Sequence, residues 1–323
     1  MRLKHGLWIG AGLTLLVFGL QMWGLTVTSL WYDETFMLYH ARNGVLAGVV
    51  GLLREDNALP LHGALLALWI KVAGDGAFAA RYLSVLLGTL TAPLLLRLGG
   101  ALSGRRGGGW GAVLAYATLP IYVYYAQEVR MYALLMPLSA GFAWAGWRVF
   151  KRGRGATAYV VLGVLMMTAH LYAGLLWAAM LVWGGIVTLC SQSPSPGMAC
   201  SNEDNRSDAP EDGAPEDGAP EDGGGLELVG GFCATWWKAN GILCLGALPI
   251  AAWALWRARV DATAVSAVPT SALRWIPVLF GVGQYLPEPW RTTFAVVALL
   301  SIGTALIALV RAGRIDGALW IAL

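Results

Sequence analysis

The sequence predicts an all-helical protein that crosses a membrane several times. Of its 323 residues, 57% are hydrophobic and 13% are charged, whereas a soluble globular protein carries about 25% charged residues. Long apolar runs recur along the chain, and short basic loops separate them. These features exclude a soluble multidomain protein, and a formal net charge of +3 is too small to indicate a nucleic-acid partner.

The apolar runs give the predicted membrane-spanning helices, each of which needs about 20 apolar residues. Uncharged runs that meet or approach this length are 7–25, 82–96, 107–127, 131–147, 155–190, 239–256 and 292–310. The run 82–96 extends to 79–98, because Arg81 and Arg97 can snorkel from its ends. The run 155–190 suits two helices with a turn near His170. Residues 316–323 begin another apolar run, which predicts that the chain is truncated or ends inside a helix.

The basic residues predict the orientation of these spans. Arg2 and Lys4 precede the first span and place the N-terminus in the cytoplasm. Because successive spans alternate in direction, all the remaining short basic loops also lie in the cytoplasm. They carry Arg97, Arg105, Arg106, Lys151, Arg152, Arg154, Arg311 and Arg314. The same alternation places two acidic segments, 33–34 and 127–132, outside.

The segments 34–42, 45–53 and 60–74 are predicted to be amphipathic helices on the outer membrane face. The last of them is apolar enough to cross the membrane, but crossing would move Arg105 and Arg106 to the outside. Pro60 at its start and Gly74 at its end suit helix boundaries.

Residues 191–228 differ from the rest of the chain. They are rich in Ser and Pro and then repeat Ala-Pro-Glu-Asp-Gly, without core-forming residues. We expect a disordered acidic cytoplasmic linker between an N-terminal membrane block, 1–190, and a truncated C-terminal block, 229–323. The cysteines show no metal-ligand spacing, and we expect no disulfide framework; they are Cys190, Cys200, Cys233 and Cys244.

The strongest functional signal is the pair of carboxylates in Trp31-Tyr32-Asp33-Glu34, directly after the first span. Ionisable groups at a membrane edge are functional candidates, because burying them costs several kcal/mol. A second external segment reads Gln127-Glu128-Val129-Arg130-Met131-Tyr132.

This order of motifs resembles the polytopic GT-C glycosyltransferases of the protein-mannosyltransferase and aminoarabinose-transferase kind, which are glycosyltransferase family 39-like. The resemblance covers most of 1–190 and is weaker over 232–290. It implies a GT-C helical bundle in the plasma (inner) membrane with its active site on the external face. It also implies inverting transfer of a monosaccharide from a polyprenyl-phosphate donor to a lipid, polysaccharide or protein acceptor.

The catalytic aspartate of that family matches Asp33, which implies a general base that takes the proton of the acceptor hydroxyl. Glu34 is its predicted catalytic partner; the alternative is an acid favoured at a helix N-terminus. Glu128 stands at the family's second acidic motif and would contact the donor sugar or a divalent metal. A single carboxylate is too little to assign a metal site, so we assign no metal ligand and no certain cofactor.

The predicted donor site also includes Arg130, Arg81, Tyr132 and His62. A guanidinium binds a phosphate through two parallel hydrogen bonds; the alternative for both arginines is a membrane anchor. Relatives often carry His-Pro-Pro after an acidic residue, whereas this chain has Asp56-Asn57-Ala58-Leu59-Pro60-Leu61-His62. We expect His62 to take the place of that histidine.

Two other functions stay open on the sequence alone. A transporter or lipid flippase would be a polytopic protein too, but its charges lie at the membrane midplane and its halves repeat. A truncated membrane fragment could bind the donor without catalysis. A further block of helices in a longer chain would favour the transferase.

Overall fold

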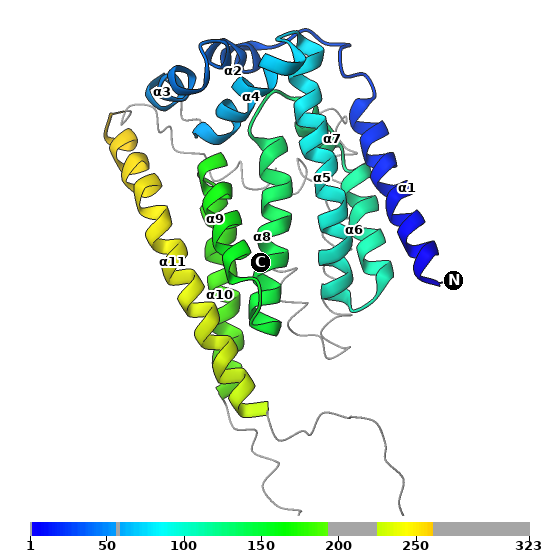
Figure 1. Ribbon diagram of the computed structural model, residues 1–323, viewed down its shortest axis with the longest axis vertical. Helices are drawn as coiled ribbons and strands as arrows, with labels where there is room; N and C mark the ends of the chain where they lie inside the picture. Colours follow the sequence, from blue (N-terminus) through cyan, green and yellow to red (C-terminus); the bar gives the residue numbers. More distant parts are fainter. Residues whose placement is uncertain (1, 56–58, 193–224, 261–323) are drawn as a thin grey trace, which may run out of the picture.

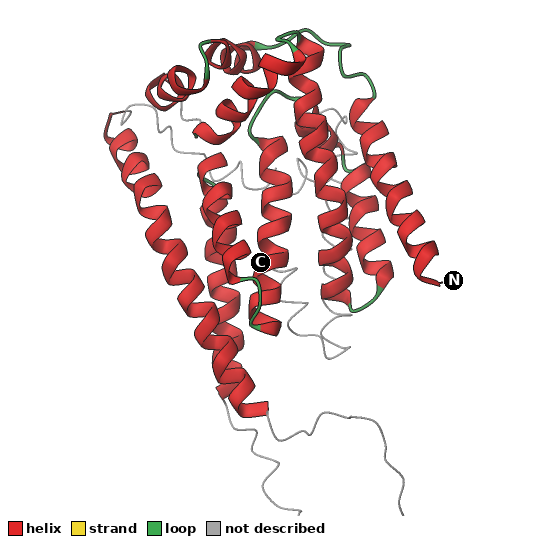
Figure 2. Ribbon diagram, viewed as in Figure 1, coloured by secondary structure: helices red, strands yellow, loops and turns green. Residues whose placement is uncertain are grey.

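The computed structural model describes residues 2–55, 59–192 and 225–260, and these segments form eleven α-helices and no strand. The helices are α1 (Arg2–Met22), α2 (Tyr32–Arg42), α3 (Val45–Glu55), α4 (Pro60–Ala73), α5 (Ala77–Ser103), α6 (Arg106–Thr118), α7 (Pro120–Gln127), α8 (Tyr132–Arg152), α9 (Ala156–Ala169), α10 (Ala173–Gln192) and α11 (Gly225–Val260). The predicted all-helical class is confirmed (Figure 2).

The long helices run side by side along the long axis, while α2, α3 and α4 gather at one end of the bundle (Figure 1). Loop 23–31 and loop 128–131 also lie at this end, which we call the site end. The opposite end, which we call the basic end, carries the start of α1 and the α5–α6 and α8–α9 turns. The predicted surface helices are therefore confirmed as separate elements of the fold.

Two described helices, α5 and the 234–257 part of α11, are long and apolar enough to cross a membrane. Shorter apolar helices accompany them at 6–22, 60–73, 156–169 and 173–186. The predicted division of 155–190 into two helices is confirmed, because α9 ends at Ala169 and α10 begins at Ala173. The predicted span 292–310 lies outside the described residues.

The predicted span 107–127 is not one continuous helix, because it consists of two consecutive helices, α6 and α7. Pro120 begins α7, and Leu119 before it has extended backbone angles, with φ −71 and ψ 118. Proline lacks an N–H group and disfavours helical angles in the residue before it. The chain therefore leaves the first helix at Leu119 and starts a new one.

The limits of the predicted linker 191–228 also shift. Helix α10 continues to Gln192, and α11 begins at Gly225, so both helices extend into the predicted linker. Residues 193–224 lie outside the described part of the chain. The proline- and aspartate-rich repeat covers only residues 209–223. The residues at the two ends of the predicted linker lie outside this repeat, so they can continue a helix.

Three buried clusters hold the described helices together. One lies between α8, α9, α10 and α11, and another joins α1, α5 and α6. The third packs Met37, Leu52 and Leu66 of the surface helices against Leu83 of α5 and Val129 of loop 128–131. Each of these fully buried side chains on α2–α4 contributes about 1.5–3 kcal/mol relative to exposure to water. This cluster fixes the surface helices, and with them Asp33 and Glu34, over the ends of α5 and α8.

Candidate active site

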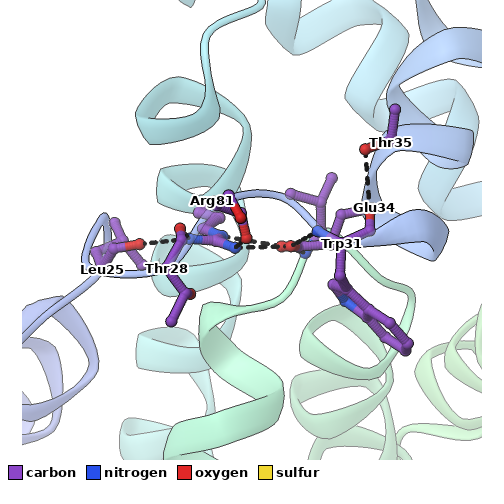
Figure 3. A network of polar contacts seen from close by, with 8 residues as sticks. Leu25, Thr28, Trp31, Glu34, Thr35 and Arg81 are labelled. Carbon is purple, nitrogen blue, oxygen red and sulfur yellow. Dashed lines mark hydrogen bonds and ion pairs between the residues drawn. The ribbon is translucent and has the colours of Figure 1, made fainter.

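A buried ion pair between Glu34 and Arg81 organises the site end (Figure 3). Arg81 donates from Nε to Oε1 of Glu34 over 2.9 Å and from Nη2 to Oε2 over 2.7 Å. The side chains of Arg81 and Glu34 are only 6% and 1% exposed. Charge-assisted pairs of this two-pronged kind are among the strongest hydrogen bonds in proteins, so α2 is fastened to the start of α5.

Arg81 also fastens the loop that precedes α2. Its Nη1 donates to the carbonyl oxygens of Leu25 and Thr28 over 2.9 and 2.8 Å (Figure 3). Its Nη2 donates to the carbonyl oxygen of Ser29 over 3.1 Å. A guanidinium has five N–H donors, and all five have a protein acceptor here. In this arrangement Arg81 has no N–H left for a donor phosphate.

The carboxylate oxygens of Glu34 also have several hydrogen-bond donors. Besides Arg81, its oxygens accept hydrogen bonds from the backbone N–H of Trp31 over 3.2 Å and of Val129 over 3.1 Å. The first bond caps the N-terminus of α2 from its third helical position, and the second reaches loop 128–131. The geometry therefore matches the alternative role of a helix N-terminal acid, extended into a junction between three segments.

Asp33 is adjacent to Glu34 in the chain but has different surroundings. Its side chain is 32% exposed, and Oδ2 lies 3.4 Å from Nη2 of Arg130, whose side chain is 13% exposed. Both acids lie in the first turn of α2, where the helix dipole favours negative charge. Only Asp33 is thus accessible to a ligand from outside the protein.

Arg130 interacts with four ionisable side chains. It pairs with Asp33, and its charge acts on Glu128, His62 and His170. Burial raises the pKa of Glu128, and the nearby carboxylates of Glu34 and Asp33 act in the same direction, against a hydrogen bond from Tyr124 and the charge of Arg130. The cluster thus combines a half-open carboxylate, a guanidinium and a carboxyl group that holds its proton more tightly than usual.

Aromatic rings form one side of this cluster. The ring of Tyr132 lies 4.4 Å from that of Tyr125 and 5.5 Å from that of His170. His170 in turn lies 4.9 Å from Tyr172, which is 72% exposed. Burial and the charge of Arg130 lower the pKa of His170. Tyr125 and His170 were not among the predicted site residues, although the run of tyrosines in α7 and the turn after α9 are visible in the sequence.

His62 lies beneath the cluster, inside the protein. It is fully buried, and neither ring nitrogen has a hydrogen-bond partner among the described residues. Burial, together with the charge of Arg130, lowers the pKa of His62 to about 4. An imidazole enclosed in this way is not exposed to a donor. Within the described segments, no group of three or more His, Cys, Asp or Glu side chains could hold a metal ion.

The helical bundle, with apolar helices of membrane length and a charged cluster at one end, has the arrangement of a polytopic membrane protein. Residues 56–194 match the family model of the dolichyl-phosphate-mannose-protein mannosyltransferases. This match confirms the predicted resemblance to the GT-C glycosyltransferases over that part of the chain, and this family uses a lipid-linked sugar donor. Neither the curated proteins nor the solved structures contain a match to the chain.

The matched segment begins after the Asp33–Glu34 pair and ends at the close of α10. It includes His62, Arg81, Glu128, Arg130 and Tyr132.

Proposed function

We propose that the protein transfers a monosaccharide, with inversion, from a polyprenyl-phosphate donor to an acceptor on the external face of the plasma membrane. Asp33 is the general base, and Arg130 binds the donor phosphate. The proposal rests on one observation: two adjacent acids differ in their exposure and in their hydrogen-bond partners. Glu34 is buried with its oxygens occupied, whereas Asp33 is one-third exposed beside Arg130.

Asp33 has the chemistry that the step requires. The acceptor hydroxyl oxygen attacks the anomeric carbon, the bond from that carbon to the phosphate oxygen breaks, and Asp33 takes the hydroxyl proton. Polyprenyl phosphate leaves with the electron pair. Inversion needs the base on the face opposite the leaving phosphate, and a base must come within about 2.6–3.2 Å of the hydroxyl oxygen.

The other charged residues support this step in different ways. Arg130 is 3.4 Å from Asp33, so a phosphate bound to the side of its guanidinium away from Asp33 would leave the sugar between the leaving group and the base. Glu128, with its raised pKa, can donate a hydrogen bond to a sugar hydroxyl when it is protonated. Tyr132 with Tyr125 offers ring faces for the sugar. We assign Glu34 and Arg81 to positioning, because their mutual bonds hold α2 in place.

The transporter alternative has less support. Transporters bind substrates near the membrane midplane through broken helices, whereas the acidic residues with described side chains lie at the site end, in α2, α3 and the loops after α4 and α7. The family match over residues 56–194 also favours an enzyme.

The direct test of the activity uses membranes that contain the full chain and membranes from cells with an empty vector. Both are incubated with a set of radiolabelled polyprenyl-phosphate sugars, and the label is followed into lipid, polysaccharide and protein fractions. Transfer that depends on the chain and on one donor supports the proposal. Equal labelling in both membranes for every donor would contradict it.

Arg130 is tested by donor titration. Arg130→Ala should weaken the apparent donor affinity about tenfold or more, because hydrogen bonds to charged groups contribute about 1.5–3 kcal/mol. Arg130→Lys should recover only part of this, since an ammonium cannot bind a phosphate in the two-pronged way. Arg42→Ala is the control, because Arg42 lies at the same end in an exposed pair with Asp75. Parental affinity in both Arg130 variants would place the donor phosphate elsewhere.

A further inference from the structure

The turn between α9 and α10 brings a histidine to the site that the proposed step does not use. Helix α8 runs from the site end to the basic end, and α9 returns beside it (Figure 1). His170, the C-cap residue of α9, therefore lies near the start of α8. Its ring centroid is 5.5 Å from that of Tyr132, the first residue of α8. The charge of Arg130 also acts on His170, so this histidine belongs to the same cluster.

The two ring nitrogens of His170 are in different states. Nδ1 accepts a hydrogen bond from the backbone N–H of Tyr172 over 3.0 Å, so Nδ1 carries no proton in this arrangement. Burial and the charge of Arg130 lower the pKa of His170, which keeps the imidazole neutral at pH 7. In a neutral imidazole one nitrogen accepts and the other carries the proton. Nε2 of His170 is therefore a hydrogen-bond donor.

This donor is open to a ligand. Nε2 has no hydrogen-bond partner among the described residues, and the side chain is only partly buried. Two contacts hold the residue in place, because its own N–H closes α9 on the carbonyl of Met166 and its Nδ1 accepts from Tyr172. His62 also has ring nitrogens without partners within the described segments, but it is fully buried. Of these two histidines, His170 alone can reach a bound sugar.

We propose that the Nε2–H group of His170 donates a hydrogen bond to a hydroxyl oxygen of the donor sugar while the sugar lies against the ring of Tyr132. The inference rests on the proposed function, in which Arg130 binds the phosphate and Tyr132 offers its ring face. A neutral N–H donor suits a neutral hydroxyl, whereas a phosphate pairs more strongly with a guanidinium.

His170 thereby selects the sugar at one ring position. That position carries a hydroxyl and not an ammonium group, because an ammonium has donors only and cannot accept from Nε2. A site that is built to hydrogen-bond a substrate hydroxyl discriminates strongly against an analogue that lacks it.

The first test compares variants of the full chain with the labelled donor that is transferred in the membrane assay. His170→Asn keeps an oxygen near the place of Nδ1, which can accept from the N–H of Tyr172, but it has no donor at the place of Nε2. It should lower kcat/KM at least about tenfold, equivalent to about 1.4 kcal/mol, and leave the unfolding midpoint close to that of the parent. His170→Gln places an amide N–H near the position of Nε2 and should recover part of the loss.

Leu171→Ala is the matched control, because Leu171 is 48% exposed in the same turn and should keep the parental kcat/KM. If His170 only closes the turn, the pattern is reversed. His170→Asn then transfers like the parent and His170→Gln is the less stable variant, which would overturn the inference and leave the proposed function intact. Failure of the parent to transfer any donor would instead contradict the proposed function.

The second test identifies the hydroxyl. Monodeoxy forms of the same donor, each without one sugar hydroxyl, are compared in the parent and in both His170 variants as a double-mutant cycle. In the parent, one deoxy form should lose at least about tenfold more kcat/KM than the others. In His170→Asn, removal of that same hydroxyl should cost less than about twofold. If the loss for every hydroxyl is the same in the parent and in His170→Asn, His170 does not contact the sugar.

Discussion

The Glu34–Arg81 pair should be the costliest pair to break at the site end. Glu34→Gln removes the negative charge and leaves the buried guanidinium of Arg81 without an anionic partner. Loss of one partner from a buried pair typically costs about 3–5 kcal/mol. We therefore expect a large fall in the unfolding midpoint of the detergent-solubilised protein.

Arg42→Gln is the matched control for that variant. It breaks the Arg42–Asp75 pair, whose side chains are 53% and 58% exposed, and exposed pairs contribute about 1 kcal/mol or less. If Glu34→Gln and Arg42→Gln unfold at the same midpoint, Glu34 is not the junction that its hydrogen bonds indicate.

His62 should make the stability of the protein depend on pH. Its pKa falls from the ordinary 6.5 to about 4 in the fold, so below pH 6.5 the unfolded chain binds a proton that the folded chain does not. Stability should be constant above about pH 6.5 and should decrease as the pH falls toward 4. The full loss is roughly 3 kcal/mol for a pKa difference of about 2.5.

The measurement is the unfolding midpoint of the parent and of His62→Leu between pH 4 and pH 8. The variant should show a flatter profile below pH 6.5. It should be at least as stable as the parent at pH 7, because it removes a buried side chain whose nitrogens have no hydrogen-bond partner among the residues that the structure describes. Identical profiles would show that His62 is not the group that titrates.

The sequence identified Asp33 as the general base but left two roles open for Glu34, a catalytic partner of Asp33 or an acid at a helix N-terminus. The difference between the two acids depends on Arg81, 47 residues away from Glu34, and on the backbone N–H of Val129, 95 residues away. Neither contact follows from local spacing. The same reason explains His62, whose burial depends on the packing of α4 and not on its neighbours in the chain.

Helix α4 lies with α2 and α3 and does not belong to the row of long helices (Figure 1). We predict that it stays on the external face. In a chain whose four native cysteines are replaced by alanine, Gly76→Cys should react with an impermeant thiol reagent in intact cells, and Gly107→Cys only after lysis. Both positions have open space for a Cβ atom. Labelling with the opposite pattern would mean that the orientation is reversed.

Helix lengths and breaks were predictable to different degrees. Apolar runs bounded by charge located α1, α5 and α8, and the excess length of 155–190 indicated the pair α9 and α10. The break at Pro120 was missed because hydropathy is continuous across it. Proline alone did not mark it, since Pro93, Pro137 and Pro249 lie inside helices.

The acidic residues with described side chains gather at one end of the molecule, the site end. Asp33 and Glu128 lie there beside Arg130, whereas Arg105 and Arg106 lie where α5 is followed by α6, at the opposite end of the bundle (Figure 1). The sequence placed the two acidic segments and the short basic loops on opposite sides because successive spans alternate in direction, and the orientation in the membrane stays a prediction.

The central claim is that Asp33 is the general base, and transfer by Asp33→Asn tests it most directly. The amide keeps the shape of the side chain and loses the base, so turnover should fall about 10²–10⁴-fold. Membrane insertion, the unfolding midpoint and donor affinity should stay close to those of the parent. Asp75→Asn, which alters an exposed acid at the same end, should keep full turnover. An Asp33→Asn protein that retains more than half of the parent turnover would contradict the assignment.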